Sequence, residues 1–542
     1  MAPDQRRMIA ETGNWDAMRR DFRWSIPERL NIAERCCDSW AGTDPRRVAI
    51  LHVGDDGSLR PWDYGRLRQA ADGLAASLAA RGVRKGDRVA VLLPQCPEVM
   101  IAHFAAMKLG AIVLPLFTLF GEDALRFRLA DSGARALVTD GANIDKVMAL
   151  AADLPELEVV YSTGPRARAP VLSFWMEISR ARGPWKTLAT LADDPAVLIY
   201  TSGTTGPPKG VVHAHRFLLG HLPSVECHHE GFPQPADIGW TPADWAWIGG
   251  LMDLAMPCLY FGVPLVSHRM RKFDPDAAFE LVRTHRVRNL FLPPTALKLM
   301  RAARVPDDLS IRSISSGGES LGADLLAWGQ DVLGAPINEI YGQTECNLVL
   351  ASCAGSMEVR PGSMGRAVPG FEVEIIDTAG QPLPPGTQGE IGVKAPNPVM
   401  FLEYWNKPDA TAAKFVNGWL KTGDLGLRDE DGYFTFLARD DDVITSAGYR
   451  IGPSEIENCL NEHPDVVMSA VVGAPDALRT QVVKAYVVLR EGADWDGLED
   501  QLINRVRQRI SPHVAPRQIE RLDTLPMTAT GKIMRRALRD GG

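Results

Sequence analysis

Between residues 46 and 266, short apolar runs alternate with stretches of helical periodicity, and this alternation constrains the fold more than any other feature. The apolar run at 89–93 precedes a helical pattern at 97–109 and a second apolar run at 111–116. Runs at 136–139 and 157–161 flank a helical segment at 146–152, and the segments 288–292, 294–303 and 311–315 repeat the theme. Such alternation predicts parallel sheets covered by helices.

The sequence pattern changes after Gly362, where the alternation of strands and helices ends. Short strands are expected at 371–377, 389–394 and 432–437, separated by Pro/Gly turns, which predicts a small antiparallel β subdomain. Beyond the polar stretch 439–442, we expect a helix at 454–462 with Ser454 as its N-cap. Strands at 466–473 and 482–489 and a helix at 498–510 follow, so the last hundred residues or so predict a separate α+β domain that begins near Asp441.

Composition excludes several functional classes. The chain has 542 residues, 45% of them hydrophobic, and a net charge of −8, which is typical of a globular protein of several domains and argues against a nucleic-acid binder. The most apolar stretch, 100–121, is interrupted by His103, Lys108, Gly110 and Pro115, and therefore predicts a buried helix and strand rather than a membrane span. We expect no transmembrane segment.

The eight cysteines are scattered, without a CxxC pair or a His-rich partner motif, and the N-terminus carries charges where a signal peptide would be apolar. This pattern predicts a cytoplasmic protein with no disulfide framework and no zinc site.

The strongest chemical signal is TSGTTGPPKG at 201–210, directly after the apolar run 196–200. Its glycines and hydroxyls offer backbone and side-chain donors to an anion, and Lys209 adds a positive charge. It is not a Walker A loop, because Pro208 and Gly210 stand where that motif needs Gly and Ser/Thr. A stretch rich in Gly, Ser and Thr can also be a flexible linker. The specific sequence TSGTTGPPKG favours an anion-binding loop over a linker.

In this motif the chain resembles the adenylate-forming (AMP-binding) superfamily, and within it the short- and medium-chain acyl-CoA synthetases. Other signatures of the superfamily follow in its order: GGE at 317–319, YGQTE at 341–345, GWLKTGD at 418–424, Arg439, AGYR at 447–450 and PMTATGK at 526–532. The resemblance covers most of residues 45–540. It implies an α/β multidomain fold, with a large N-terminal AMP-binding domain (1–440) of two α/β subdomains plus a small β subdomain. A mobile C-terminal α+β domain (441–542) would be hinged at Asp441.

By resemblance, Thr344 contacts the α-phosphate, Glu345 holds Mg²⁺, and Lys209 belongs to the catalytic set. Gly318 and Glu319 resemble part of the adenine shelf, Asp424 a ribose ligand and Arg439 a second ribose or phosphate contact. The implied ATP site comprises Thr201, Ser202, Gly203, Thr204, Thr205, Gly206, Gly318, Glu319, Glu339, Ile340, Tyr341, Gly342, Gln343, Thr344, Asp424, Arg439 and Lys532. His213 and His215 could serve as general bases, but we expect structural or surface roles for them.

The C-terminal signatures imply the rest of the reaction. Lys532 resembles the lysine that stabilises negative charge as the substrate carboxylate displaces pyrophosphate. The domain would then turn and line a pantetheine tunnel for coenzyme A. Residues implied to contact coenzyme A are Ala447, Gly448, Tyr449, Arg479 and Arg517.

The acid is less clearly specified. The implied acid-binding residues are Trp247, Ile248, Gly249, Gly342 and Arg450. Gly342 stands where acetate-specific relatives have a wall-forming tryptophan, so we expect room for a longer acid, whereas Trp245 is bulkier than expected. Short, branched, medium-chain and aryl acids all remain open.

The expected function is an AMP-forming acyl-CoA synthetase that uses ATP, Mg²⁺ and coenzyme A, with no prosthetic group. We also expect an acetyltransferase and deacetylase to act on Lys532, and a homodimer as one assembly. The alternatives are an adenylating enzyme that loads an amino acid or aryl acid onto a carrier protein, and a non-catalytic nucleotide-binding protein. The second would be expected to lack Lys532, Glu345 or Lys209, and all three are present.

Overall fold

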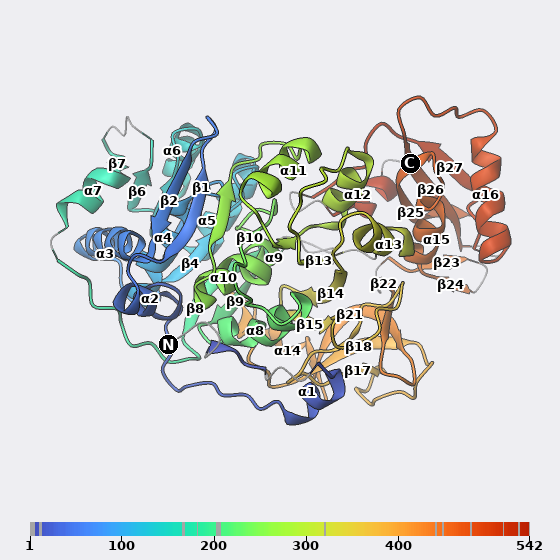
Figure 1. Ribbon diagram of the computed structural model, residues 1–542, viewed down its shortest axis with the longest axis horizontal. Coiled ribbons are helices and arrows are strands. Elements are labelled where there is room, and N and C mark those ends of the chain that lie inside the picture. The colour runs from blue at the N-terminus through green and yellow to red at the C-terminus, as the bar shows by residue number, and fades with distance from the viewer. Residues whose placement is uncertain are drawn as a thin grey trace.

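The computed structural model describes residues 6–9, 13–164, 169–181, 183–201, 208–318, 321–439, 442–446, 449–476, 480–512, 514–528 and 532–540. The chain forms two large sheets, a small β subdomain and a C-terminal α+β unit. In Figure 1 the large sheets lie at the left and centre, and the C-terminal unit lies above the β subdomain at the right. The predicted fold class is confirmed.

The first large sheet has nine strands in the order β16-β15-β14-β13-β12-β10-β11-β1-β2. Its strands β11, β10, β12, β13 and β14 are parallel, and antiparallel pairs close both ends. The strands are β1 (Val48–Val53), β2 (Leu59–Asp63), β10 (Gly239–Trp240), β11 (Leu265–His268), β12 (Asn289–Phe291), β13 (Ser313–Gly317), β14 (Ile337–Gln343), β15 (Cys346–Ala351) and β16 (Arg366–Ala367).

The second large sheet has eight strands in the order β19-β9-β8-β4-β3-β5-β6-β7, and its strands from β8 to β7 are parallel. The strands are β3 (Arg88–Leu92), β4 (Ile112–Pro115), β5 (Ala136–Thr139), β6 (Val159–Ser162), β7 (Leu172–Ser173), β8 (Pro195–Thr201), β9 (Lys209–Ala214) and β19 (Glu403–Tyr404). The predicted runs at 89–93, 111–116, 136–139 and 157–161 are therefore neighbours in one sheet.

Helices cover these sheets, as the alternating pattern predicts. The longer ones are α3 (Tyr64–Ala80), α4 (Pro97–Lys108), α5 (Glu122–Ser132), α6 (Ile144–Leu150), α7 (Phe174–Arg180), α8 (Phe217–His228), α10 (Met256–Phe261), α11 (Pro275–Thr284), α12 (Pro294–Ala302) and α13 (Ala323–Asp331). Helix α4 is buried on all sides, and its Lys108 pairs with Asp72 at 2.8 Å and with Asp38. None of the helices in the described ranges is long and apolar enough to span a membrane.

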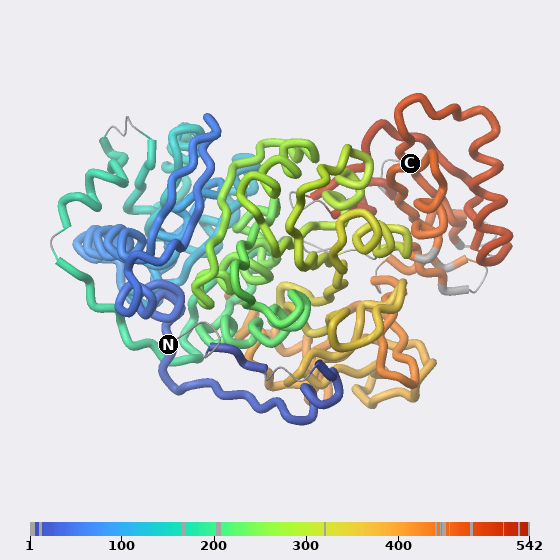
Figure 2. Tube along the Cα trace, in the orientation of Figure 1, coloured from blue at the N-terminus to red at the C-terminus, as the bar shows by residue number. Residues whose placement is uncertain are grey.

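The β subdomain is a five-stranded antiparallel sheet. It consists of β17 (Val373–Ile376), β18 (Gly389–Lys394), β20 (Phe415–Val416), β21 (Trp419–Arg428) and β22 (Phe434–Arg439). The N-terminal segment with α1 (Trp15–Asp21) runs along this subdomain (Figure 2). Asp16 binds Arg366 at 2.6 Å and the Trp24 indole donates to the Gly370 carbonyl, which fastens the segment there.

The C-terminal unit has a sheet and core of its own. Its elements are β23 (Ile444–Ser446), β24 (Tyr449–Ile451), α15 (Pro453–Asn461), β25 (Val466–Asp476), β26 (Thr480–Leu489), α16 (Leu498–Arg509), β27 (Gln518–Arg521) and α17 (Arg535–Asp540). The predicted N-cap was wrong. Helix α15 begins at Pro453 and is capped by the extended Gly452, because proline is well suited to a first helical turn and extends the helix past Ser454.

Candidate functional site

The residues expected to bind ATP come from strand ends of both large sheets and from the β subdomain. Thr201 is the last residue of β8, and Lys209 opens the antiparallel strand β9 opposite it. The Thr201 hydroxyl donates to the Lys209 carbonyl at 3.4 Å. Residues Ser202, Gly203, Thr204, Thr205 and Gly206 lie outside the described residues, as do Glu319, Asp441, Ala447, Gly448 and Arg479.

Thr344 and Glu345 form the turn between β14 and β15. The Tyr404 hydroxyl donates a short hydrogen bond to Glu345 Oε1, and the Lys209 ammonium lies 5.1 Å from the centre of the same tyrosine ring. The pKa of Tyr404 is raised by burial and by the neighbouring Glu345 carboxylate, so this hydroxyl keeps its proton and acts as a donor. The Lys209 ammonium, the Tyr404 hydroxyl and the Glu345 carboxylate therefore lie close together where β9 begins.

A second polar group surrounds the buried Asp424. Its Oδ2 accepts hydrogen bonds from the Tyr341 hydroxyl and from the Gln343 amide, both at 2.7 Å. Arg439 lies opposite Asp424 in the β21–β22 pair, with its guanidinium 3.6 Å from Oδ1. These donors fix the direction of the carboxylate. Tyr341 and Gln343 are distant in the sequence from Asp424 and Arg439, and these four residues, all predicted to bind ATP, therefore lie together.

Lys532 of the C-terminal unit reaches this region. Gly318 follows β13 with φ +105°, and a Cβ atom placed on it would lie 3.5 Å from Lys532 Cε. The parallel register pairs Gly317 with Ile340, so the lysine stem lies at the carboxyl ends of β13 and β14. Ligands of open α/β sheets bind at such strand ends.

Glu339 and Ile340 lie on β14 itself. Ile340 belongs to the core. Glu339 is 3% exposed, and burial raises the pKa of its carboxyl group to about 8. It is therefore a neutral hydrogen-bonding group at neutral pH rather than a second anion beside the nucleotide phosphates.

In the expected acid region, the half-buried Trp247 packs against Phe291 of the core. Trp247 caps the short helix α9 (Ile248–Gly250), and its ring centre is 5.5 Å from that of Phe291 at the end of β12. A Cβ atom on Gly249 would lie 2.9 Å from the Trp247 ring, so this glycine lets the backbone pack flat against the indole. Trp245 is 1% exposed and belongs to the core instead.

The expectation that Gly342 opens room for a longer acid stays a prediction, and the structure shows a backbone role for this glycine. A Cβ atom on Gly342 would lie 2.3 Å from Leu348 N and 2.8 Å from Asn347 Cα. The space in front of Gly342 is filled by the backbone of β15, because the β14–β15 hairpin folds back on itself here. Gly342 therefore permits the close approach of the two strands of this hairpin.

His213 and His215 lie in the core. Both are 0% exposed, and burial lowers the pKa of His213 to about 3 and that of His215 to about 4. His213 stacks on Phe217, and His215 Nδ1 accepts from the Ile32 amide. Groups this hard to protonate are poor general bases at neutral pH, so the geometry favours the structural reading.

The residues expected to contact coenzyme A belong to the C-terminal unit. Tyr449 lies on β24, which pairs with β23 at the edge of the C-terminal sheet. Arg450, which was expected to bind the acid, lies on the same strand. Arg517 is exposed just before β27, and its backbone amide donates to the Val483 carbonyl. Their roles stay predictions.

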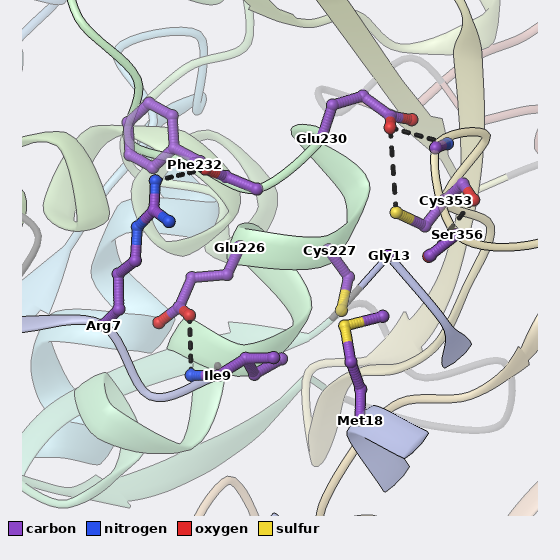
Figure 3. A pocket seen from close by; sticks show the side chains of 12 residues that line it. Arg7, Ile9, Gly13, Met18, Glu226, Cys227, Glu230, Phe232, Cys353 and Ser356 are labelled. Atoms are coloured by element: carbon purple, nitrogen blue, oxygen red, sulfur yellow. Dashed lines mark hydrogen bonds between the residues drawn. The ribbon is translucent and has the colours of Figure 1, made fainter. Parts of the chain in front are cut away.

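A cavity of about 240 Å³ lies elsewhere, between the N-terminal segment and the end of α8 (Figure 3). Glu226 lies on its wall and accepts from the Met8 and Ile9 amides, while the Arg7 guanidinium donates to the Gly231 carbonyl. Among the described residues that line it, none belongs to the predicted ATP or acid site. The cavity lies where these hydrogen bonds hold the N-terminal segment against the end of α8.

Sequence reasoning missed Tyr404 and Phe291. Tyr404 reaches Glu345 because β19 pairs with β9, with Tyr404 opposite Val211. Phe291 is the last residue of β12 and reaches Trp247, the residue before α9. Both contacts depend on pairings across long sequence separations, and no local motif signals them.

Comparisons with known proteins identify the family of the chain. A profile of the family "AMP-binding enzyme" matches residues 37–405, and one of the "AMP-binding enzyme C-terminal domain" matches residues 455–532. The chain is 34% identical to the mitochondrial acyl-coenzyme A synthetase ACSM2 of Rattus norvegicus over 532 residues, which cover 95% of this chain and 92% of the relative.

Solved structures are similar over almost their whole length. The acyl-CoA synthetase of Brucella canis shares 33% identity with a TM-score of 0.76, covering 97% of this chain and 98% of that one. ATP-bound MatB from Rhodopseudomonas palustris shares 30% identity with a TM-score of 0.84, covering 95% and 99%. Profile, relatives and strand-end site agree, and the chain belongs to the AMP-binding enzyme family, among its acyl-CoA synthetases.

Proposed function

We propose that this protein is an AMP-forming acid:CoA ligase that works in two half-reactions. In the first, a carboxylate oxygen attacks the α-phosphorus of ATP. A new O–P bond forms, the bond from the α-phosphorus to the bridging oxygen breaks, and pyrophosphate leaves. In the second, the thiol of coenzyme A attacks the acyl carbon, so that a C–S bond forms and AMP leaves with the electron pair. The observation that carries the proposal is the Lys532 stem beside Gly318, at the strand ends where the Asp424 group also lies.

The first half-reaction needs charge stabilisation rather than a protein nucleophile. We assign Lys532 and Lys209 to the phosphate oxygens, Thr344 to the α-phosphate, and Asp424 with Arg439 to the ribose. The support is their arrangement: the Asp424 carboxylate is held by Tyr341 and Gln343, so it is already oriented for two hydroxyl donors.

The residues present fit a magnesium ion. Glu345 is partly exposed in its turn and offers a carboxylate whose direction is set by Tyr404. Mg²⁺ usually takes one or two protein carboxylates and completes its shell with phosphate oxygens and water. Bound there, it would neutralise charge on the phosphates, while Tyr404 orients the Glu345 carboxylate.

For the acid, we propose a short to medium-chain, branched or aryl carboxylic acid with an apolar body. The half-buried Trp247, which packs against the core residue Phe291, supports this choice, because aromatic side chains in a binding site favour apolar groups over charged ones. For coenzyme A, we propose that β24 and Arg517 supply contacts after the C-terminal unit has turned.

The function is tested by incubating the protein with ATP, Mg²⁺, coenzyme A and a panel of carboxylic acids, and by identifying AMP and the thioester by mass spectrometry. We expect acid-dependent AMP and acyl-CoA in equal amounts. Lys532→Ala serves as the catalytic control and Arg521→Gln, an exposed arginine on β27, as the matched surface control. AMP without thioester, in every acid tested, would point to a carrier-protein acceptor instead.

We further propose that acetylation of Lys532 switches off the first half-reaction. The side chain is exposed, and acetylation removes its charge. Protein carrying acetyl-lysine at 532 should lose adenylation by about 10²–10³-fold and regain it after deacetylase treatment. Full activity of the acetylated protein would end this idea.

We place the enzyme in the cytoplasm. All eight cysteines are free thiols, seven of them buried, which suits a reducing compartment. A fluorescent fusion expressed in the native cell tests the placement.

A further inference from the structure

Lys532 stands on a small hairpin that is continuous with helix α17. The Thr528 amide donates to the Lys532 carbonyl at 2.8 Å, and the Lys532 amide donates back to the Thr528 hydroxyl at 3.1 Å. Met527 and Ile533 form an antiparallel bridge beside this pair. Because α17 begins at Arg535, the direction of this helix largely sets the direction of the lysine.

Two arginines of α17 hold acidic residues of the same unit. Arg535 makes a bidentate contact with Glu457 at 2.7 and 2.8 Å, and Glu457 also accepts from the Val471 amide. Arg539 Nη2 lies 3.2 Å from Asp442 Oδ1, and Arg535 Nη1 lies 3.9 Å from Asp442 Oδ2. The Asp442 side chain is 11% exposed, so water screens these charges less than it screens a surface pair.

Asp442 also touches the nucleotide side of the molecule. Its backbone amide donates to the carbonyl of Arg439 at 3.0 Å, and the Arg439 guanidinium faces Asp424. Contacts therefore link Asp424, Arg439, Asp442 and Arg539 in that order. Arg539 lies on α17, the helix that begins three residues after Lys532.

We propose that Asp442 and Arg539 are positioning residues for Lys532 in the first half-reaction. Their ion pair fixes α17 relative to the point where the chain enters the C-terminal unit, and so holds the Lys532 hairpin at the strand ends beside Gly318. The inference rests on the proposed function. It assigns no contact with substrate to either residue.

The two arginines of α17 have different tasks. Arg535 and Glu457 join α17, α15 and β25, so their loss would loosen the fold of the C-terminal unit. Arg539 sits near the end of α17 with 30% of its side chain exposed, and α17 is also held by the buried Leu538, whose carbonyl accepts from Tyr486. Replacing Arg539 should therefore leave the unit folded while freeing the direction of the hairpin.

The test separates the half-reactions in the full-length protein. Adenylation is measured as acid-dependent exchange of pyrophosphate into ATP, and thioester formation is measured from synthetic acyl-AMP and coenzyme A. The variants are Arg539→Gln, Asp442→Asn, their double combination and the conservative Arg539→Lys. Arg521→Gln is the matched control, and thermal unfolding monitors the fold.

Arg539→Gln and Asp442→Asn should each lower exchange by about 10–100-fold, since a displacement near 1 Å of a catalytic group can cost about 10²-fold. Thioester formation from acyl-AMP should stay within about twofold. The double variant should be no slower than the slower single one, because both remove the same contact. Arg539→Lys should recover most of the exchange rate.

Unchanged exchange in both single variants would overturn the proposal, and so would an equal loss in both half-reactions. Absence of exchange in the wild-type protein with every acid would be a different result, because it would reject the proposed function itself.

Discussion

Gly342→Ala is expected to damage the protein although it adds a single methyl group. The added Cβ would lie 2.3 Å from Leu348 N and 2.8 Å from Asn347 C and Cα, and all three of these atoms are backbone. Since carbon atoms pack at about 3.5 Å, the β14–β15 hairpin would have to open by about 1 Å. Overpacking of this kind costs about 1–3 kcal/mol.

The same shift moves the turn that carries Thr344 and Glu345. A displacement near 1 Å can lower a rate by about 10²-fold, so pyrophosphate exchange should fall by that order for every acid alike. Gly322→Ala is the matched control, because Gly322 caps α13 and a Cβ atom there meets nothing within 4 Å. Urea unfolding and exchange kinetics, measured with acids of increasing length, check both parts.

A Gly342→Ala protein with wild-type stability and exchange would refute this reasoning. So would a selective loss of long acids with short acids unaffected, because that outcome would mean that Gly342 lines the acyl pocket after all.

Three further predictions follow from the site and the core. Lys532→Ala should lower exchange by about 10²–10³-fold and leave thioester formation from supplied acyl-AMP largely intact, and equal losses in the two assays would reject its role. Tyr404→Phe removes the donor to Glu345 and should raise the Mg²⁺ concentration needed for half-maximal exchange by about 10-fold or more, which a magnesium titration measures. His103→Leu should make the stability of the protein less sensitive to acid. Burial lowers the pKa of His103 from 6.5 to about 3, and no partner of either ring nitrogen is found among the described residues. The contribution of this histidine to stability is therefore present above pH 6.5 and is lost as the pH falls toward 3. Between about pH 7.5 and 5.5 the wild type should lose about 1 kcal/mol more stability than this variant, as chemical unfolding at the two pH values would reveal.

Much of the fold could be predicted because its signals are local. The strand at 136–139 and the strand at 389–394 were predicted with their observed bounds, Ala136–Thr139 and Gly389–Lys394. Apolar runs between turn residues leave little freedom in such cases. The N-cap of α15 was misplaced because Ser454 is a strong capping residue, whereas the preceding Pro453 extends the helix by a position that propensity alone does not reveal.

The site could be predicted only where a motif carries it. Tyr341, Gln343 and Asp424 were predicted to share a ligand, and they share hydrogen bonds. The role of Gly342 could not be inferred from its missing side chain, because what fills that space is the backbone of a neighbouring strand. Tyr404 had no local signal at all, since only the pairing of β19 with β9 places it beside Lys209.

The central claim is that the acid attacks the α-phosphorus of ATP, and oxygen transfer tests it most directly. The protein is incubated with ATP, Mg²⁺, coenzyme A and an accepted carboxylic acid labelled with ¹⁸O in both carboxylate oxygens, and the products are analysed by mass spectrometry. One labelled oxygen should appear in the phosphate of AMP, and the other should remain on the thioester carbonyl, with pyrophosphate unlabelled. Label in pyrophosphate or inorganic phosphate, with AMP unlabelled, would contradict an acyl-adenylate and with it the roles assigned here to Lys532, Thr344 and Glu345.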